Sequence, residues 1–134
     1  MTAVDDSVRT AVQAALSKKA EEVIVLDVSV LCGFAQTMVV CHGHSRRQVQ
    51  TVAEEVTRTL REHGVRPHHV EGKTRGEWIL LDYIDFVVHI FLEERRRFFA
   101  LERLWGDAPR LEVGSGPGKL DFRPGEQPDG VMGS

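Results

Sequence analysis

Apolar residues recur at intervals of three and four in two segments of the chain, which is the spacing of one face of a helix. Segment 5–19 begins with acids and ends with lysines, as the helix dipole favours. Segment 45–63 begins with Ser45 and Gln48, the S-x-x-Q spacing of a capping box, and Gly64 follows it. The pattern therefore predicts two amphipathic helices. Their apolar positions are Val8, Ala11, Val12, Ala15 and Leu16 in the first, and Val49, Val52, Ala53, Val56 and Leu60 in the second.

Short runs of β-branched and other apolar residues lie between turn-forming residues, which is typical of buried strands. Two of them, 23–28 and 37–41, separate the predicted helices, and 68–71 is a third candidate. The segments 78–81 and 86–91 are apolar on both alternating sides and read as a hairpin whose two faces both require cover. Five strands are therefore expected.

A third helix is predicted after the hairpin, because Phe98, Leu101, Leu104 and Trp105 again have helical spacing. The order of elements predicts an α/β (α+β) domain with a mixed five-stranded sheet and three main helices over residues 1–113. Residues 114–134 contain six Gly and three Pro in 21 residues, so we expect a disordered tail without regular structure.

Charge and cysteine content narrow the class of protein. A net charge of -3 and a pI near 6.1 argue against a protein that coats nucleic acid and favour a protein partner or a small ligand. The start of the chain lacks the basic and apolar blocks of a secretory signal, so Cys32 and Cys41 are expected to be reduced in the cytosol. The uncharged segment 28–45 is too polar for a membrane span.

One turn of the chain suggests an enzyme as an alternative function. The turn Gly43–Ser45 lies between a strand and a helix start, where main-chain N–H groups can hold phosphate, as in a nucleotidyltransferase. Such enzymes bind metal with two carboxylates on one side of a strand, at i and i+2. Asp82 and Asp85 stand at i and i+3, which favours a turn. A nucleotide-binding or nucleotidyltransferase-like enzyme is therefore the alternative function rather than the preferred one.

Other candidate chemistry is weak. Two groups of residues are rich in histidine. The first contains Cys41, His42 and His44, and the second contains His63, His68 and His69. Neither group has the paired ligand spacing of a zinc site. No catalytic, metal or cofactor residue is predicted. Arg46 and Arg47 oppose the dipole at the start of their helix, so we expect a compensating acid or partner.

Four motifs together resemble one family. SRRQVQ (45–50), RPHHVEG (66–72), WILLDYIDFVVHIF (78–91) and FFALERLWGDAP (98–109) resemble, in order and spacing, the Iojap-like family, called ribosomal silencing factor in bacteria. The resemblance implies a nucleotidyltransferase-like fold without the catalytic carboxylates. It also implies binding to the large ribosomal subunit through ribosomal protein L-fourteen, which blocks joining of the small subunit and represses translation, for example under nutrient limitation. Members commonly form homodimers.

The hairpin is where a partner surface is expected. Trp78 is the predicted anchor, and Asp82 and Asp85 offer charge complementary to a basic ribosomal protein. The predicted rim and support are Arg47, Glu71 and Tyr83, with His89 tying its strand to the third helix. Neither sequence-specific nucleic-acid binding nor membrane binding is expected, and a structural dimer module with another partner remains a third possibility.

One departure from the family concerns the hairpin turn. The family usually carries glycine where this chain has Ile84. A β-branched residue resists positive φ, so we expect a type I turn with Asp82 at its first position.

Overall fold

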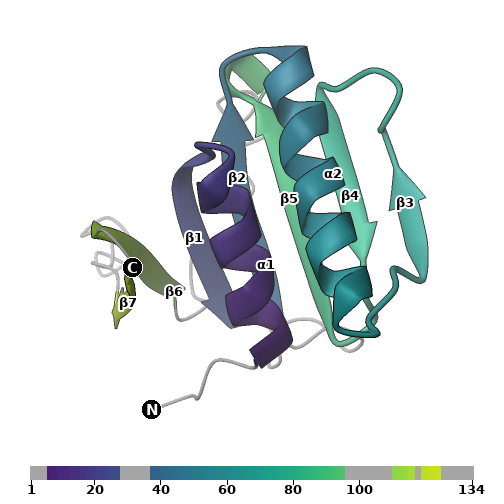
Figure 1. Ribbon diagram of the computed structural model, residues 1–134. Coiled ribbons are helices and arrows are strands. Elements are labelled where there is room, and N and C mark those ends of the chain that lie inside the picture. The colour runs from purple at the N-terminus through teal and green to yellow at the C-terminus, as the bar shows by residue number, and fades with distance from the viewer. Residues whose placement is uncertain (1–5, 28–36, 96–109, 117–118, 125–134) are drawn as a thin grey trace, which may run out of the picture.

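The computed structural model describes residues 6–27 and 37–95 in full and the main chain of 110–116 and 119–124. Along these residues one helix precedes the first two strands and a second helix precedes the remaining strands, and the two helices lie side by side across one face of a sheet (Figure 1). The elements are α1 (Asp6–Ser17), β1 (Glu21–Asp27), β2 (Thr37–Gly43), α2 (Arg46–Glu62), β3 (His69–Glu71), β4 (Trp78–Asp82), β5 (Phe86–Leu92), β6 (Arg110–Gly116) and β7 (Lys119–Pro124).

Both described helices follow the predicted segments and bury the predicted apolar faces. Ser45 caps α2, because its side chain accepts a hydrogen bond from the Gln48 main-chain N–H. Gln48 reaches back one residue further than in a capping box and accepts from the N–H of His44. Gly64 adopts a φ of 79° just after α2, as expected for a helix-ending glycine. Neither helix combines the length and hydropathy of a membrane span within the part of the chain described.

The sheet has the order β3-β4-β5-β2-β1-β6-β7. Only the central pair of β2 and β5 is parallel among the strand pairs described, so the sheet is mixed, as predicted. All five predicted strands are present as β1 to β5, and β4 and β5 form the predicted antiparallel hairpin. The prediction of a single α+β domain is therefore confirmed.

The alternation of side chains along the strands divides the sheet into two apolar faces. On the helix side, alternate residues such as Val39, Ile79 and Ile90 join the buried faces of α1 and α2 in one core. On the opposite side a smaller cluster contains Ile24, Leu26, Met38, Val40 and Phe91, with Trp78 packed against it. The prediction that both faces of the hairpin require cover is confirmed by the burial of residues on each side.

Two strands were not predicted. β6 pairs with the edge of β1, and β7 pairs with β6, so the sheet continues into residues expected to lack regular structure. The expectation for 114–134 is therefore wrong for the strand residues 114–116 and 119–124. Pairing with an existing sheet edge satisfies main-chain hydrogen bonds, which offsets the low apolar content. Residues 117–118 and 125–134, and the apolar positions of the predicted third helix, lie outside the described residues.

The turn of the β4–β5 hairpin also differs from its prediction. Ile84 has a φ of 73°, and the N–H of Asp85 donates to the carbonyl of Tyr83 at 2.8 Å, the two-residue span of a γ-turn. Asp82 accepts from the N–H of Ile84 at 2.8 Å. These two hydrogen bonds, together with the bond from the N–H of Tyr83 to the carbonyl of Phe86, hold the β-branched residue in a left-handed conformation. The type I turn was the wrong expectation.

Candidate functional site

The sheet surface opposite the helices, over β3, β4 and β5, gathers most of the residues predicted for a partner surface. The antiparallel registers place residues from the three strands opposite one another, and opposite residues in a sheet point to the same side. We call this surface the outer face. Its members are His69 and Glu71 from β3, Trp78, Leu80 and Asp82 from β4, and Val87, His89 and Phe91 from β5.

Trp78 is fixed on the outer face by two different contacts. Its indole Nε1 donates a hydrogen bond of 2.9 Å to Nδ1 of His89 on the neighbouring strand. Its ring stacks on Phe91, with ring centres 5.0 Å apart and planes inclined by 27°. The side chain is half-buried, so part of the indole lies at the surface. A large aromatic residue held in one orientation loses little conformational entropy when a partner binds it.

His89 supports this arrangement through its protonation state. The residue is only 6% exposed, and burial lowers the pKa of its imidazole to about 4. The ring is therefore neutral near pH 7, which leaves Nδ1 able to accept the indole hydrogen bond and puts the proton on Nε2. The predicted link from His89 to the third helix lies outside the described residues. Within the described part, its hydrogen bond goes to Trp78.

Acidic and half-buried apolar side chains share the outer face with Trp78. Leu80 and Val87 are half-buried neighbours on the outer face. Asp82 lies opposite both Val87 and His69 in the registers, and exposed Glu71 pairs with His69 at 2.7 Å. The outer face thus combines acids with an aromatic anchor and apolar area, and aromatic residues are enriched at protein-binding surfaces.

Two predicted rim residues lie elsewhere. Tyr83 is 7% exposed, stacks on Phe86 with ring centres 4.8 Å apart, and belongs to the helix-side core. Arg47 is exposed in the first turn of α2, which packs on the helix side of the sheet. Asp85 is exposed in the hairpin turn, next to the outer face.

Sequence reasoning did not assign four members of the outer face to the partner surface: His69, Leu80, Val87 and Phe91. Counting alternate positions from Trp78 finds Leu80, and counting from His89 finds Val87. His69 requires the β3–β4 register as well, because a three-residue strand has no alternation to read.

The Gly43–Ser45 turn does not resemble a phosphate site. The N–H of His44 is already bonded to the Gln48 side chain at 2.7 Å, and that side chain lies over Gly43. Ser45 uses its oxygen to cap α2. Glu21 and Glu93 flank His44, and their charge opposes a phosphate. These contacts argue against the nucleotide-binding alternative.

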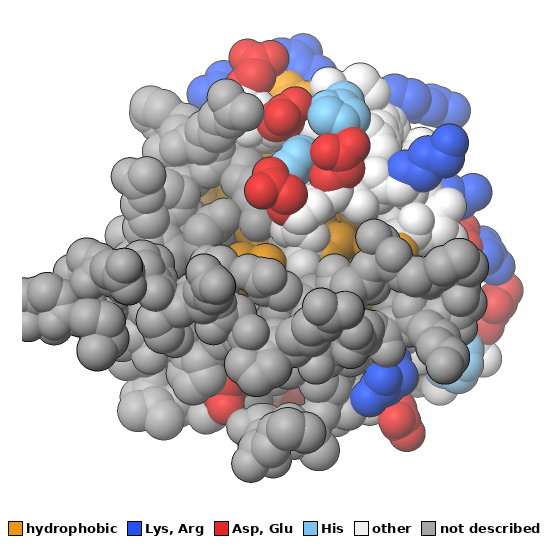
Figure 2. Space-filling view, turned by 90° about the vertical axis from the view of Figure 1, so that its left-hand side faces the viewer, with side chains coloured by type: hydrophobic (Ala, Val, Ile, Leu, Met, Phe, Trp, Pro, Cys, Tyr) orange, Lys and Arg blue, Asp and Glu red, His pale blue; other side chains and the backbone are white. Residues whose placement is uncertain are grey.

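Histidines and acids gather at one end of the sheet, where Figure 2 shows their side chains close together. Exposed His44 hydrogen-bonds to Glu21 and Glu93, and these bonds raise the pKa of its imidazole. Buried His42 lies 3.9 Å from Glu21 and 3.7 Å from Glu22. In the second predicted histidine group, His63 bonds the Thr59 carbonyl, away from His69. Among the described residues, no cluster has the geometry of a metal site.

Comparison with known proteins agrees with this geometry. The family model "Ribosomal silencing factor during starvation" matches residues 2–129. A ribosomal silencing factor from Halalkalibacterium halodurans is 40% identical over 103 residues, covering 77% of this chain and 88% of the relative. One from Bacillus subtilis is 37% identical over 99 residues, covering 74% and 84% respectively.

Solved structures show the same fold. A crystal structure of a protein from Chromobacterium violaceum superposes with a TM-score of 0.75 at 35% identity, covering 90% of this chain and 92% of that one. The family match extends beyond residue 113, where the sequence predicts the domain to end. The predictions of the family and of a protein that is not an enzyme are confirmed: this chain belongs to the ribosomal silencing factor family, whose plant relatives are named Iojap.

Proposed function

We propose that this protein binds the large ribosomal subunit through ribosomal protein L-fourteen and prevents the small subunit from joining. It thereby represses translation in the cytoplasm, for example when nutrients are scarce. The observation that supports this role best is the locked, half-buried Trp78 on the acid-bearing outer face. No chemical step is required, because occupying the intersubunit surface is sufficient.

The chemistry of the outer face suits a ribosomal protein. Such proteins are generally basic, so Glu71, Asp82 and Asp85 complement their charge and orient the encounter. Trp78 then supplies the apolar contact, with Leu80 and Val87 further along the same face. Aromatic anchors surrounded by polar groups carry much of the binding energy in protein interfaces.

We further propose that the free protein is a homodimer. On the outer face Trp78, Leu80 and Val87 stay only half-buried in the single chain, and symmetric self-association is the commonest way in which chains cover such apolar area. Light scattering at tens of micromolar should give twice the mass of the chain, and a monomer mass would contradict the dimer.

Co-sedimentation tests the main proposal. The protein should pellet with isolated large subunits and remain in the supernatant with isolated small subunits. Added in excess to both subunits, it should reduce the fraction that sediments as joined ribosomes. Purified L-fourteen should compete with large subunits for the protein. Binding to large subunits that L-fourteen cannot compete away would place the contact on another component.

A ligand test separates this function from the nucleotide-binding alternative. ATP or GTP with magnesium should leave the melting temperature unchanged, because the turn N–H of His44 is occupied and acids flank it. A shift of several degrees that inorganic triphosphate at the same concentration does not reproduce would favour the enzyme instead.

A further inference from the structure

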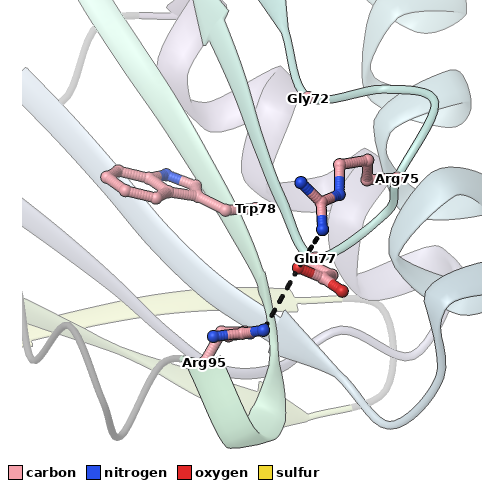
Figure 3. A pocket seen from close by; sticks show the side chains of 5 residues that line it. All are labelled: Gly72, Arg75, Glu77, Trp78 and Arg95. Carbon is pink, nitrogen blue, oxygen red and sulfur yellow. Dashed lines mark ion pairs between the residues drawn. The ribbon is translucent and has the colours of Figure 1, made fainter.

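A cleft of about 290 Å³ lies beside the outer face, between the β3–β4 loop and the end of β5. It is lined by Gly72, Arg75, Glu77, Trp78 and Arg95. In Figure 3 the two arginines approach Glu77 from different elements, with Trp78 next to them. Trp78 therefore belongs to both the cleft and the outer face.

The charges in the cleft are unbalanced. Glu77 pairs closely with Arg46, at 2.6 Å through Oε2. Its other oxygen lies 3.5 Å from Arg95 and 3.9 Å from Arg75. One carboxylate thus faces three guanidinium groups. The distances to Arg75 and Arg95 exceed the roughly 2.7–2.9 Å of a good charge-assisted hydrogen bond, so both groups can bind a further anion.

The loop that carries Arg75 is held in place. Gln50 of α2 donates to the carbonyls of Lys73 and Thr74, both at 3.0 Å. The N–H of Gly76 donates to the carbonyl of Gly72, and Gly76 packs so closely on Arg46 that a Cβ would lie 2.9 Å from its carbonyl oxygen. Because the loop is fixed before binding, a ligand has little ordering entropy to offset.

This anchoring also explains one of the two arginines at the start of α2. Arg46 has the compensating acid expected from the sequence, and that acid is Glu77. The pairing brings the β3–β4 loop onto the first turn of α2. Exposed Lys73, which directly follows Gly72 in the β3–β4 loop, adds positive charge to the same region.

We propose that the cleft binds a phosphate group of the ribosomal RNA backbone, next to the protein contact made by the outer face. This inference rests on the proposed function, because the ribosome presents RNA phosphates around its proteins. Guanidinium forks match phosphate oxygens in geometry and charge. The net charge of -3 suits one local contact of this kind rather than a coat of nucleic acid. Such a contact fixes orientation and reads no sequence.

The double variant Arg75→Gln/Arg95→Gln tests the cleft. The control is Arg61→Gln/Arg66→Gln, which removes the same charge from exposed arginines at the opposite end of α2. Affinity for large subunits is measured by co-sedimentation between roughly 50 and 200 mM salt. The cleft variant should bind about tenfold more weakly at low salt, and its logarithmic salt dependence should be shallower by about one unit. The control should match the wild type. A cleft variant that also matches it overturns the proposal.

A second measurement does not depend on ribosomes. The Trp78 indole N–H resonance is followed by NMR, assigned with Trp78→Phe, while a short RNA duplex is added at low salt. We expect a shift in the wild type and in the control, and none in the cleft variant. Absence of a shift in the wild type overturns the inference. An equal shift with polyglutamate would do the same, because the cleft would then recognise carboxylates. If wild-type protein fails to pellet with large subunits but shows the RNA shift, the proposed function fails and the phosphate site stands.

Discussion

The indole of Trp78 donates its N–H to a histidine, His89, that burial keeps neutral. The hydrogen bond runs diagonally between adjacent strands, because Trp78 lies opposite Phe91 whereas His89 lies opposite Leu80. The orientation of Trp78 on the outer face therefore depends on the protonation state of His89. The role of Trp78 in binding and the pKa of His89 can be tested separately.

Trp78→Ala should weaken binding to large subunits by about 2 kcal/mol or more, as truncation of an interface anchor does. Trp78→Phe is the matched control, because a phenyl ring can still stack on Phe91 while the hydrogen bond to His89 is lost. Its loss of affinity should be smaller. The measurement is co-sedimentation over a concentration series. If Trp78→Ala binds with wild-type affinity, the outer face is not the docking surface. If the variant shows no cooperative thermal unfolding by circular dichroism, Trp78 is instead a core residue.

Stability should depend on pH through His89. Its folded pKa of about 4 lies below its ordinary value of 6.5, so the unfolded chain binds more protons between these values. The free energy of unfolding is then highest above about pH 6.5 and decreases by up to about 3 kcal/mol as the pH falls towards 4. His89→Gln keeps an acceptor for Trp78 and removes this titration. Urea unfolding of both proteins at several pH values isolates the effect, since all the other titratable groups, including His44, are present in each. If the free energy of unfolding of the two proteins depended on pH in the same way, the pKa of His89 would not be lowered in the folded protein.

Ile84→Gly should stabilise the protein. Positive φ costs an L-residue roughly 1–2 kcal/mol, and glycine avoids this cost while losing about 0.5–1 kcal/mol to chain entropy. A net gain of about 0.5–1 kcal/mol is expected, because the 56% exposed side chain buries little area. Ile84→Ala retains the left-handed strain and serves as the control. A destabilised glycine variant would mean that the Ile84 side chain contributes more than its exposure indicates.

Gly72 and Gly64 form a second matched pair. Their φ values are 81° and 79°, so alanine meets the same backbone strain at both positions. A Cβ on Gly72 would lie 1.9 Å from the Trp78 carbonyl oxygen, whereas Gly64 has no atom within 4 Å of that point. Thermal and urea unfolding should show a cost of at least about 3 kcal/mol for Gly72→Ala and about 1 kcal/mol for Gly64→Ala. Equal costs would show that the loop can move away from β4.

The sequence predicts the sheet and the helices well because their signals are local. The apolar spacing in α2 and the capping residue Ser45 lie within a few residues of one another, and each agrees with the structure. The same holds for the apolar runs that became β2 and β5. The β6–β7 pair lacks such a signal, because its stability depends on the edge of β1 rather than on its own composition.

The candidate site was predicted only in part, for a related reason. Trp78, Asp82 and His89 stand close together in the sequence, and the hairpin register brings them onto one face. Tyr83 was misplaced because it directly follows Asp82, and successive side chains along an extended chain point to opposite faces, so Tyr83 belongs to the helix-side core. Glu77 was missed entirely. Its three arginines come from a helix, a loop and the region after β5, and no spacing along the chain relates them.

The single parallel pair at the centre of the described sheet has a consequence for how the molecule forms. β1 with β2 and β4 with β5 are local antiparallel pairs that can close early, while β2 and β5 meet only after the chain has crossed through α2. Closing that loop costs conformational entropy before the β2–β5 contacts can form. Pairing of β2 with β5 should therefore limit the rate of folding. Nascent chains that end before Leu92 cannot complete the central ladder, and a newly made molecule acquires its full sheet only late in its own synthesis.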